Sequence, residues 1–224
     1  MNILSEIEAF INEHNLNIDE DFNIDSIRIE FQKQYKLEKL QEVGKWHKIN
    51  AKDQKIMSKL KKRLTTDEIT TAYQLEKESI YYYNSSTPPK YRQATLVIFG
   101  MKQYHKQPPK REHIIKILSI LKSISNIDIC IDLPYKPNIE ALKKHFDVER
   151  YFTKDRVPTD THYINNPFIN MIEKITIYDK AFKNSLDGVL WRIEAKVIIP
   201  NVKILALPLF ELTEIINIAR VQND

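Results

Sequence analysis

Residues 126–133 read Asn-Ile-Asp-Ile-Cys-Ile-Asp-Leu, so isoleucine occupies every second position of this stretch. Alternation with a period of two is typical of a β-strand whose two faces have different surroundings. The isoleucines predict a buried face, and Asp128, Cys130 and Asp132 predict a polar one. The stretch therefore predicts a half-buried strand that presents two carboxylates on a single side.

Two later stretches repeat this pattern of one apolar and one ionisable face. Residues 174–180 read Lys-Ile-Thr-Ile-Tyr-Asp-Lys, and residues 189–197 read Val-Leu-Trp-Arg-Ile-Glu-Ala-Lys-Val. Residues 184–188, which contain Gly188, predict a hairpin loop of about five residues between these two strands. If all three strands are neighbours in one sheet, their ionisable side chains share a surface. These side chains are Asp128, Asp132, Tyr178, Lys180, Arg192 and Glu194.

The rest of the chain alternates between helical and strand patterns. Apolar spacing predicts strands at 22–31, 94–99 and 161–165, and helices at 3–11, 51–75 (with a break near Thr65), 114–121, 139–146 and 209–219. This order predicts an α+β fold, with a largely antiparallel sheet whose one face is covered by helices. The breaker at 85–89 (Ser-Ser-Thr-Pro-Pro) predicts a soft boundary. It separates a mixed helical and strand region, 1–88, within the same domain or apart from it, from an α+β domain, 89–224.

Composition excludes several classes of site. The chain has 224 residues, of which 42% are hydrophobic and 29% charged, so it is expected to be globular. With 3 glycines it cannot assemble a Gly-rich phosphate loop or a dinucleotide fingerprint. Its single cysteine, Cys130, excludes an internal disulfide and a zinc site made of several thiolates.

The sequence predicts a cytoplasmic protein that has no membrane partner. The first ten residues carry Glu6 and Glu8, where a signal peptide would need basic residues followed by an apolar run. No stretch approaches the roughly 18 consecutive apolar residues that a spanning helix requires.

Positive charge is clustered, although the formal net charge is only +4. Residues 45–63 hold eight Lys or Arg against one Asp, and residues 102–122 hold six against one Glu. Clusters of this kind neutralise DNA phosphates, but they also form ordinary solvated helix faces and loops. The expected DNA-binding residues are Lys102, Lys106, Lys110 and Arg111.

The shared polar face has the residue types needed for phosphoryl transfer. Carboxylates are the preferred ligands of Mg²⁺ or Mn²⁺, which predicts a metal site at Asp128, Asp132 and Glu194. A tyrosine hydroxyl becomes a nucleophile when a base or cation lies close to it, and Lys180 or Arg192 would supply positive charge near Tyr178. A half-solvated antiparallel sheet shows the same alternation without any chemistry, so a purely structural interpretation stays open.

The three strings, in this order, resemble the trans-acting Rep class of rolling-circle replication initiators of plasmids and phages. That family has an aspartate-bearing strand, a "YDK" or "YNK" strand and an "RxE" strand, which match residues 126–132, 175–180 and 190–194. The resemblance covers roughly residues 91–200. It implies that Tyr178 is the nucleophile and that Asp128 or Asp132, together with Glu194, holds the metal. Asn126 stands where the family commonly has arginine.

The expected function is therefore DNA nicking at a replication origin. Attack by Tyr178 would leave a 5′-phosphotyrosine link and a free 3′-OH that primes rolling-circle replication. The DNA origin, a homodimer and a host helicase are the expected partners. Two alternatives stay open: a non-catalytic DNA-binding protein of a mobile element, and a conjugative relaxase with the same chemistry. His162 is expected either as a proton shuttle near the tyrosine or as a surface or hydrogen-bonded histidine at a strand start.

Overall fold

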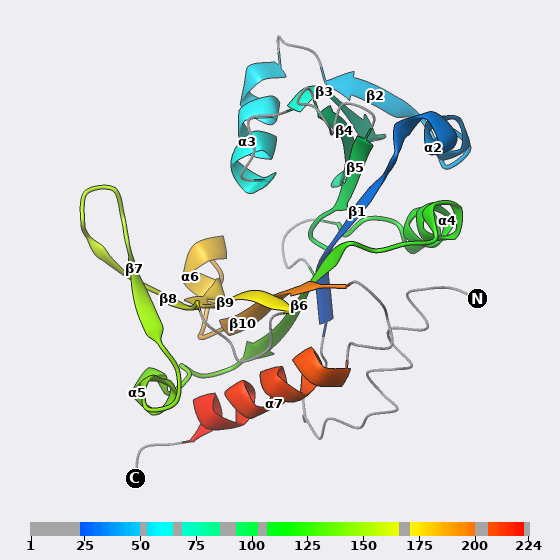
Figure 1. Cartoon of the computed structure of the whole chain (residues 1–224). Helices are drawn as coiled ribbons and strands as arrows, with labels where there is room; N and C mark the ends of the chain where they lie inside the picture. Colours follow the sequence, from blue (N-terminus) through cyan, green and yellow to red (C-terminus); the bar gives the residue numbers. More distant parts are fainter. Residues whose placement is uncertain are drawn as a thin grey trace. The chain divides into compact units, whose positions relative to one another are not determined.

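The computed structural model describes residues 23–49, 53–64, 69–85, 93–102, 107–165, 171–199 and 206–221. Its contacts divide the chain into two compact units (Figure 1). Among the described residues, unit 1 is 26–125, and unit 2 is 23–25 with 126–221. Each unit combines antiparallel strands with helices, which confirms the predicted α+β class. The helix predicted at 3–11 lies outside the described residues.

Unit 1 contains five antiparallel strands in the order β2-β3-β4-β5-β1. The strands are β1 (Asn23–Gln32, of which 26–32 belong here), β2 (Trp46–Ile49), β3 (Ile69–Leu75), β4 (Ile80–Ser85) and β5 (Gln93–Ile98). The helices are α2 (Lys33–Leu40), α3 (Gln54–Leu64) and α4 (Arg111–Leu121). One core cluster joins α3 to the strands through Leu60, Ala72, Tyr83 and Val97.

The helical prediction for residues 51–75 was correct for α3 and wrong for β3. The segment Ile69–Leu75 pairs with the tyrosine-rich β4 instead of continuing the helix. Threonine and tyrosine favour strands, since their side chains pack well on a pleated surface. Strands β4 and β5 flank the predicted boundary at 85–89 and pair with each other, while the contacts divide the chain after Ser125.

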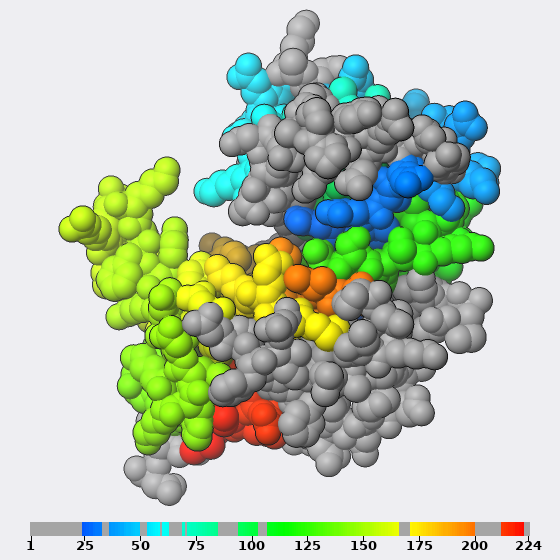
Figure 2. All heavy atoms as spheres, in the orientation of Figure 1, coloured from blue at the N-terminus to red at the C-terminus, as the bar shows by residue number. Residues whose placement is uncertain are grey.

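Unit 2 contains five antiparallel strands in the order β6-β10-β9-β8-β7. The strands are β6 (Asn126–Leu133), β7 (Val148–Phe152), β8 (Pro158–Ile164), β9 (Ile172–Asp179) and β10 (Trp191–Ile198). The helices are α5 (Ile139–Lys143), α6 (Lys180–Asn184) and α7 (Ala206–Arg220). Strands β7 and β8 form a hairpin, seen as the yellow-green projection in Figures 1 and 2. Helix α7 packs on β10 and α5.

The connection between β9 and β10 is longer than the predicted five-residue loop. Strand β9 ends at Asp179, whose side chain accepts a hydrogen bond from the backbone N–H of Phe182 at 2.8 Å and so caps α6. Aspartate is a favoured N-cap because its carboxylate satisfies an amide left unpaired at the helix start. Ser185 ends the helix in the left-handed conformation, with φ 52°. Lys180 therefore belongs to a helix and not to the strand.

Candidate active site

The strand register confirms that the polar side chains of unit 2 share one face. Arg192 of β10 lies opposite Asp132 of β6 on one side and opposite Tyr178 of β9 on the other. Glu194, which is two residues further along β10, lies opposite Cys130 of β6 and Thr176 of β9. Directly opposed residues of an antiparallel pair project to the same face. The polar face is thus built from three neighbouring strands.

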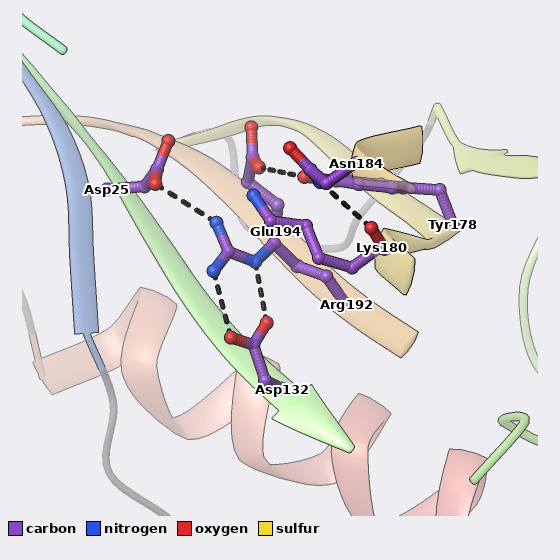
Figure 3. A network of polar contacts seen from close by, with 7 residues as sticks. All are labelled: Asp25, Asp132, Tyr178, Lys180, Asn184, Arg192 and Glu194. Carbon is purple, nitrogen blue, oxygen red and sulfur yellow. Dashed lines mark hydrogen bonds and ion pairs between the residues drawn. The ribbon is translucent and has the colours of Figure 1, made fainter. Parts of the chain in front are cut away.

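Arg192, which is itself fully buried, forms an ion network at the centre of this face (Figure 3). Its Nε and one terminal nitrogen donate to the two carboxylate oxygens of Asp132, at 2.6 and 2.9 Å. Its other terminal nitrogen donates to Asp25 at 3.0 Å. The side chain is 0% exposed, and two carboxylates surround its charge. In this arrangement Arg192 holds three strands together and is not available to a phosphate.

Tyr178 and Glu194 are directly connected beside that network. The phenol donates a hydrogen bond to Glu194 Oε2 at 3.1 Å, as Figure 3 shows. Tyr178 is only 5% exposed, and burial, together with the negative charge of Glu194, raises the pKa of its hydroxyl. The phenol is therefore protonated near neutral pH, and the carboxylate that would accept its proton is already in place.

Two lysines of α6 bring positive charge to the tyrosine. Lys183 Nζ lies 4.1 Å from the ring centroid of Tyr178, and Lys180 Nζ lies 6.0 Å from it. Lys180 is buried; burial lowers the pKa of its amine, and the charge of Arg192 lowers it further. The side-chain amide of Asn184 donates to the Lys180 carbonyl at 2.8 Å, which fixes the first turn of α6. A lysine with a lowered pKa transfers its proton more readily.

The predicted carboxylate metal site is not assembled by the described residues. No group of three His, Cys, Asp or Glu side chains in this part of the chain lies close enough to hold a metal ion. Asp128 and Asp132 are four residues apart on β6, which corresponds to roughly 13 Å along a strand. Metal–oxygen bonds of about 2 Å cannot span that separation with two short side chains. Asp132 is also bound at both oxygens by Arg192, and Asp128 lies opposite Lys196.

His162 and Cys130 do not serve the tyrosine. His162 lies opposite Ile177 and therefore on the other face of the sheet from Tyr178, so the proton-shuttle prediction was wrong. The surface position of the second alternative was wrong as well, because His162 is buried, and its Nδ1 has no hydrogen-bond partner among the described residues. Cys130 is buried between the two aspartates, and burial raises the pKa of its thiol to about 12. It stays protonated and packs as a small apolar group.

The predicted DNA-binding residues lie in unit 1. Lys110 precedes α4, and its ammonium lies 3.3 Å from Glu76 and 4.0 Å from Glu78, so part of its charge is balanced within the protein. Arg111 is exposed at the start of α4, and Lys102 is half-buried in a bend. Lys106 lies outside the described residues.

Sequence reasoning missed two members of the polar face. Asp25 of β1 is 167 residues away from Arg192, and no spacing rule connects such positions. The only indication was an acidic residue inside a strand otherwise rich in isoleucine. Lys183 was missed because it lies between the predicted strand, 174–180, and the predicted hairpin loop, 184–188. Recognising Asp179 as a helix cap would have placed Lys183 one turn beyond the tyrosine.

No protein-family model matches the chain, and a search of curated proteins finds no match. Among the described residues, no helix is long and apolar enough to cross a membrane.

Proposed function

We propose that the protein nicks one strand of a plasmid or phage replication origin, with Tyr178 as the nucleophile. The observation that carries the proposal is the hydrogen bond of 3.1 Å from the Tyr178 hydroxyl to Glu194. It joins the "YDK" and "RxE" strings on one face of a rigid sheet. A nucleophile that already donates to a base is the arrangement required for covalent catalysis.

The proposed step is an in-line displacement at the scissile phosphate. The Tyr178 oxygen bonds to phosphorus, its proton passes to Glu194, and the bond from phosphorus to the 3′ oxygen breaks. Lys180, whose pKa is lowered by burial, gives a proton to the leaving 3′ oxygen. Lys183, at the ring of Tyr178, offsets negative charge on the phosphate. The products are a 5′-phosphotyrosine and a free 3′-OH.

Dependence on Mg²⁺ or Mn²⁺ stays part of the proposal, without a preformed three-carboxylate site. Mg²⁺ is commonly held by one or two carboxylates together with substrate phosphates. Glu194 is the carboxylate next to the nucleophile, so an ion that arrives with the DNA would meet it there.

The test is a nicking assay on supercoiled plasmid that carries the DNA flanking the gene. With Mg²⁺ or Mn²⁺ we expect relaxed circles and a protein–DNA adduct that survives detergent. Tyr178→Phe should lower nicking by at least about 1,000-fold, because the attacking oxygen is gone. DNA binding should change by no more than about twofold, since phosphate contacts dominate that affinity.

Tyr163→Phe is the matched control. Tyr163 lies on β8 opposite Thr176, on the same face as Tyr178, and its ring is covered by Lys174 at 3.4 Å. Nicking by this variant should stay within about twofold of the parent, because neighbouring surface changes have small effects. Equal loss in both variants, or no adduct with the parent protein under any metal condition, would overturn the proposal.

A second candidate function is non-catalytic DNA binding, as expected of a mobile-element protein that keeps the sheet and not the chemistry. The observation in its favour is burial: Tyr178 is 5% exposed, and Arg192 is saturated by two aspartates. The same assay separates the two functions. DNA binding by the parent protein with no relaxed product and no adduct would establish the second candidate and exclude the first.

A further inference from the structure

A cavity lies in unit 2 where α5, β7, β8 and the end of α7 meet. Its volume is about 670 Å³, within the usual range for sites that hold small organic ligands. His162 of β8 is among its lining residues, and the strand register puts this histidine on the opposite face of the sheet from Tyr178. The cavity is therefore separate from the candidate active site.

The lining of the cavity carries excess positive charge. It contains four cations, Lys136, Lys143, Arg150 and Arg220, against the two carboxylates Glu140 and Asp160. Asp160 accepts contacts from Arg150 at 3.3 Å and Lys136 at 3.5 Å, and Glu140 is paired with Lys143 at 2.8 Å. Asp160 carries one negative charge and is shared by two cations. The cavity therefore keeps a net positive charge. Such a lining favours a ligand with at least one negative charge.

A buried polar atom marks the inner wall. His162 is 6% exposed, and no group in the described part of the chain hydrogen-bonds its buried Nδ1. Burial, followed by the charges of Arg150 and Lys136, lowers the pKa of this histidine. The side chain of His162 lines the cavity, and leaving a buried polar atom unpaired is costly.

The lining of the cavity is partly aromatic. Tyr135 lines the cavity and is 36% exposed, and Pro137, Ile139 and Val221 add apolar surface. A nucleobase can stack on an exposed tyrosine ring, whereas a free phosphate gains nothing from it. The lining thus combines cations with an aromatic ring, and these correspond to the phosphate and the base of a nucleotide.

We propose that this cavity binds a nucleoside phosphate, with the phosphate at Lys136, Lys143, Arg150 and His162 and the base on Tyr135. The ligand is either a free mononucleotide or the phosphorylated end of a DNA strand, which present the same chemistry. The inference goes beyond the nicking proposal, because it uses the other face of the sheet and would hold for a non-catalytic protein.

Binding of four probes to the full chain tests the proposal by calorimetry: thymidine 5′-monophosphate, thymidine, inorganic phosphate and a 5′-phosphorylated tetranucleotide. We expect the nucleotide to bind with a Kd below about 1 mM and at least tenfold more tightly than thymidine or phosphate. Only the nucleotide can contact both the cations and the aromatic ring. A tetranucleotide that binds tenfold more tightly than the mononucleotide identifies a strand end as the ligand. Equal affinities identify the free nucleotide.

The variants are chosen so that the fold is retained. Lys136 and Lys143 are about half exposed, and Lys136→Ala with Lys143→Ala should weaken nucleotide binding at least about tenfold through loss of charged contacts. Lys154→Ala removes an exposed cation from the turn of the same β7–β8 hairpin, outside the cavity lining, and should change binding less than about twofold. Absence of binding by both phosphorylated nucleosides, phosphate binding equal to that of the nucleotide, or equal weakening in both variants would overturn the proposal.

Discussion

Arg192 and Arg150 lie on strands of unit 2 and both pair with aspartates, yet their surroundings differ completely. Arg192 is 0% exposed and is held between Asp132 and Asp25. Arg150 lies on the other face, with a side chain that is 46% exposed, and contacts Asp160 at 3.3 Å. One guanidinium is enclosed by unit 2, and the other faces a cavity open to solvent.

This difference determines what each ion pair does. Water screens an exposed pair, so such a pair contributes little to stability and its cation stays available to an outside anion. A buried pair is not screened, and each of its charges depends on its partner for solvation. The same residue type therefore fixes the fold on one face of the sheet and can recruit a ligand on the other.

The largest expected effect comes from Arg192→Met. Removing the guanidinium leaves Asp25 and Asp132 buried without their cation, which typically costs about 3–5 kcal/mol. Urea unfolding followed by circular dichroism gives the free energy of unfolding. If the free energy of unfolding falls by less than about 1 kcal/mol, burial does not distinguish Arg192 from Arg150.

A combined variant distinguishes the ion network from packing around it. Arg192→Met together with Asp25→Leu and Asp132→Leu removes all three charges at once. Because replacing a whole buried ion network by apolar residues is often neutral or stabilising, we expect the combined variant to be more stable than Arg192→Met alone. If the combined variant is less stable than Arg192→Met, the loss in the single variant comes from altered packing and not from unpaired charge.

The cavity histidine gives an intermediate effect that depends on pH. The pKa of His162 is lowered in the folded protein from the ordinary 6.5, so the unfolded chain takes up a proton first as the pH falls. Stability contributed by neutral His162 is therefore complete above pH 6.5 and is lost on acidification below it. His162→Gln should flatten this part of a stability–pH profile measured by urea unfolding, and an unchanged profile would contradict the assignment.

The smallest expected effect on stability comes from Arg150→Met. Both partners of the pair with Asp160 are about half exposed, so we expect the free energy of unfolding to change by less than about 1 kcal/mol. The same urea titration measures it. A loss as large as that of Arg192→Met would mean that burial does not distinguish the two faces.

The sequence predicted the strands of unit 2 well because one face of each is apolar. Strand β6 was predicted with its observed bounds, and β10 within two residues at its start, since isoleucine and valine alternate there with polar residues. Strands β2, β3, β4 and β7 were not predicted. In β7 the exposed Tyr151 and Phe152 break the alternation that a half-buried strand shows.

The polar face was predicted as a surface, and its internal pairing was not. Alternation predicted that Asp132, Tyr178, Arg192 and Glu194 point the same way, and the register confirms it. It could not predict that Arg192 is taken up by Asp25, because that contact depends on where a distant strand lies. Arg192 does bring the predicted positive charge to Tyr178, since it lies opposite the tyrosine and its charge lowers the pKa of the phenol, while its hydrogen bonds go to the two aspartates.

The sequence by itself determined which side each residue of β6, β9 and β10 faces, because the side-chain period of a strand is a local property of the backbone. Only the tertiary structure decided which residues of that face meet. It placed the Tyr178 hydroxyl on Glu194 and enclosed Arg192 between two carboxylates. Distances between side chains depend on register and burial, and these are set by the packing of the whole unit and not by any single segment.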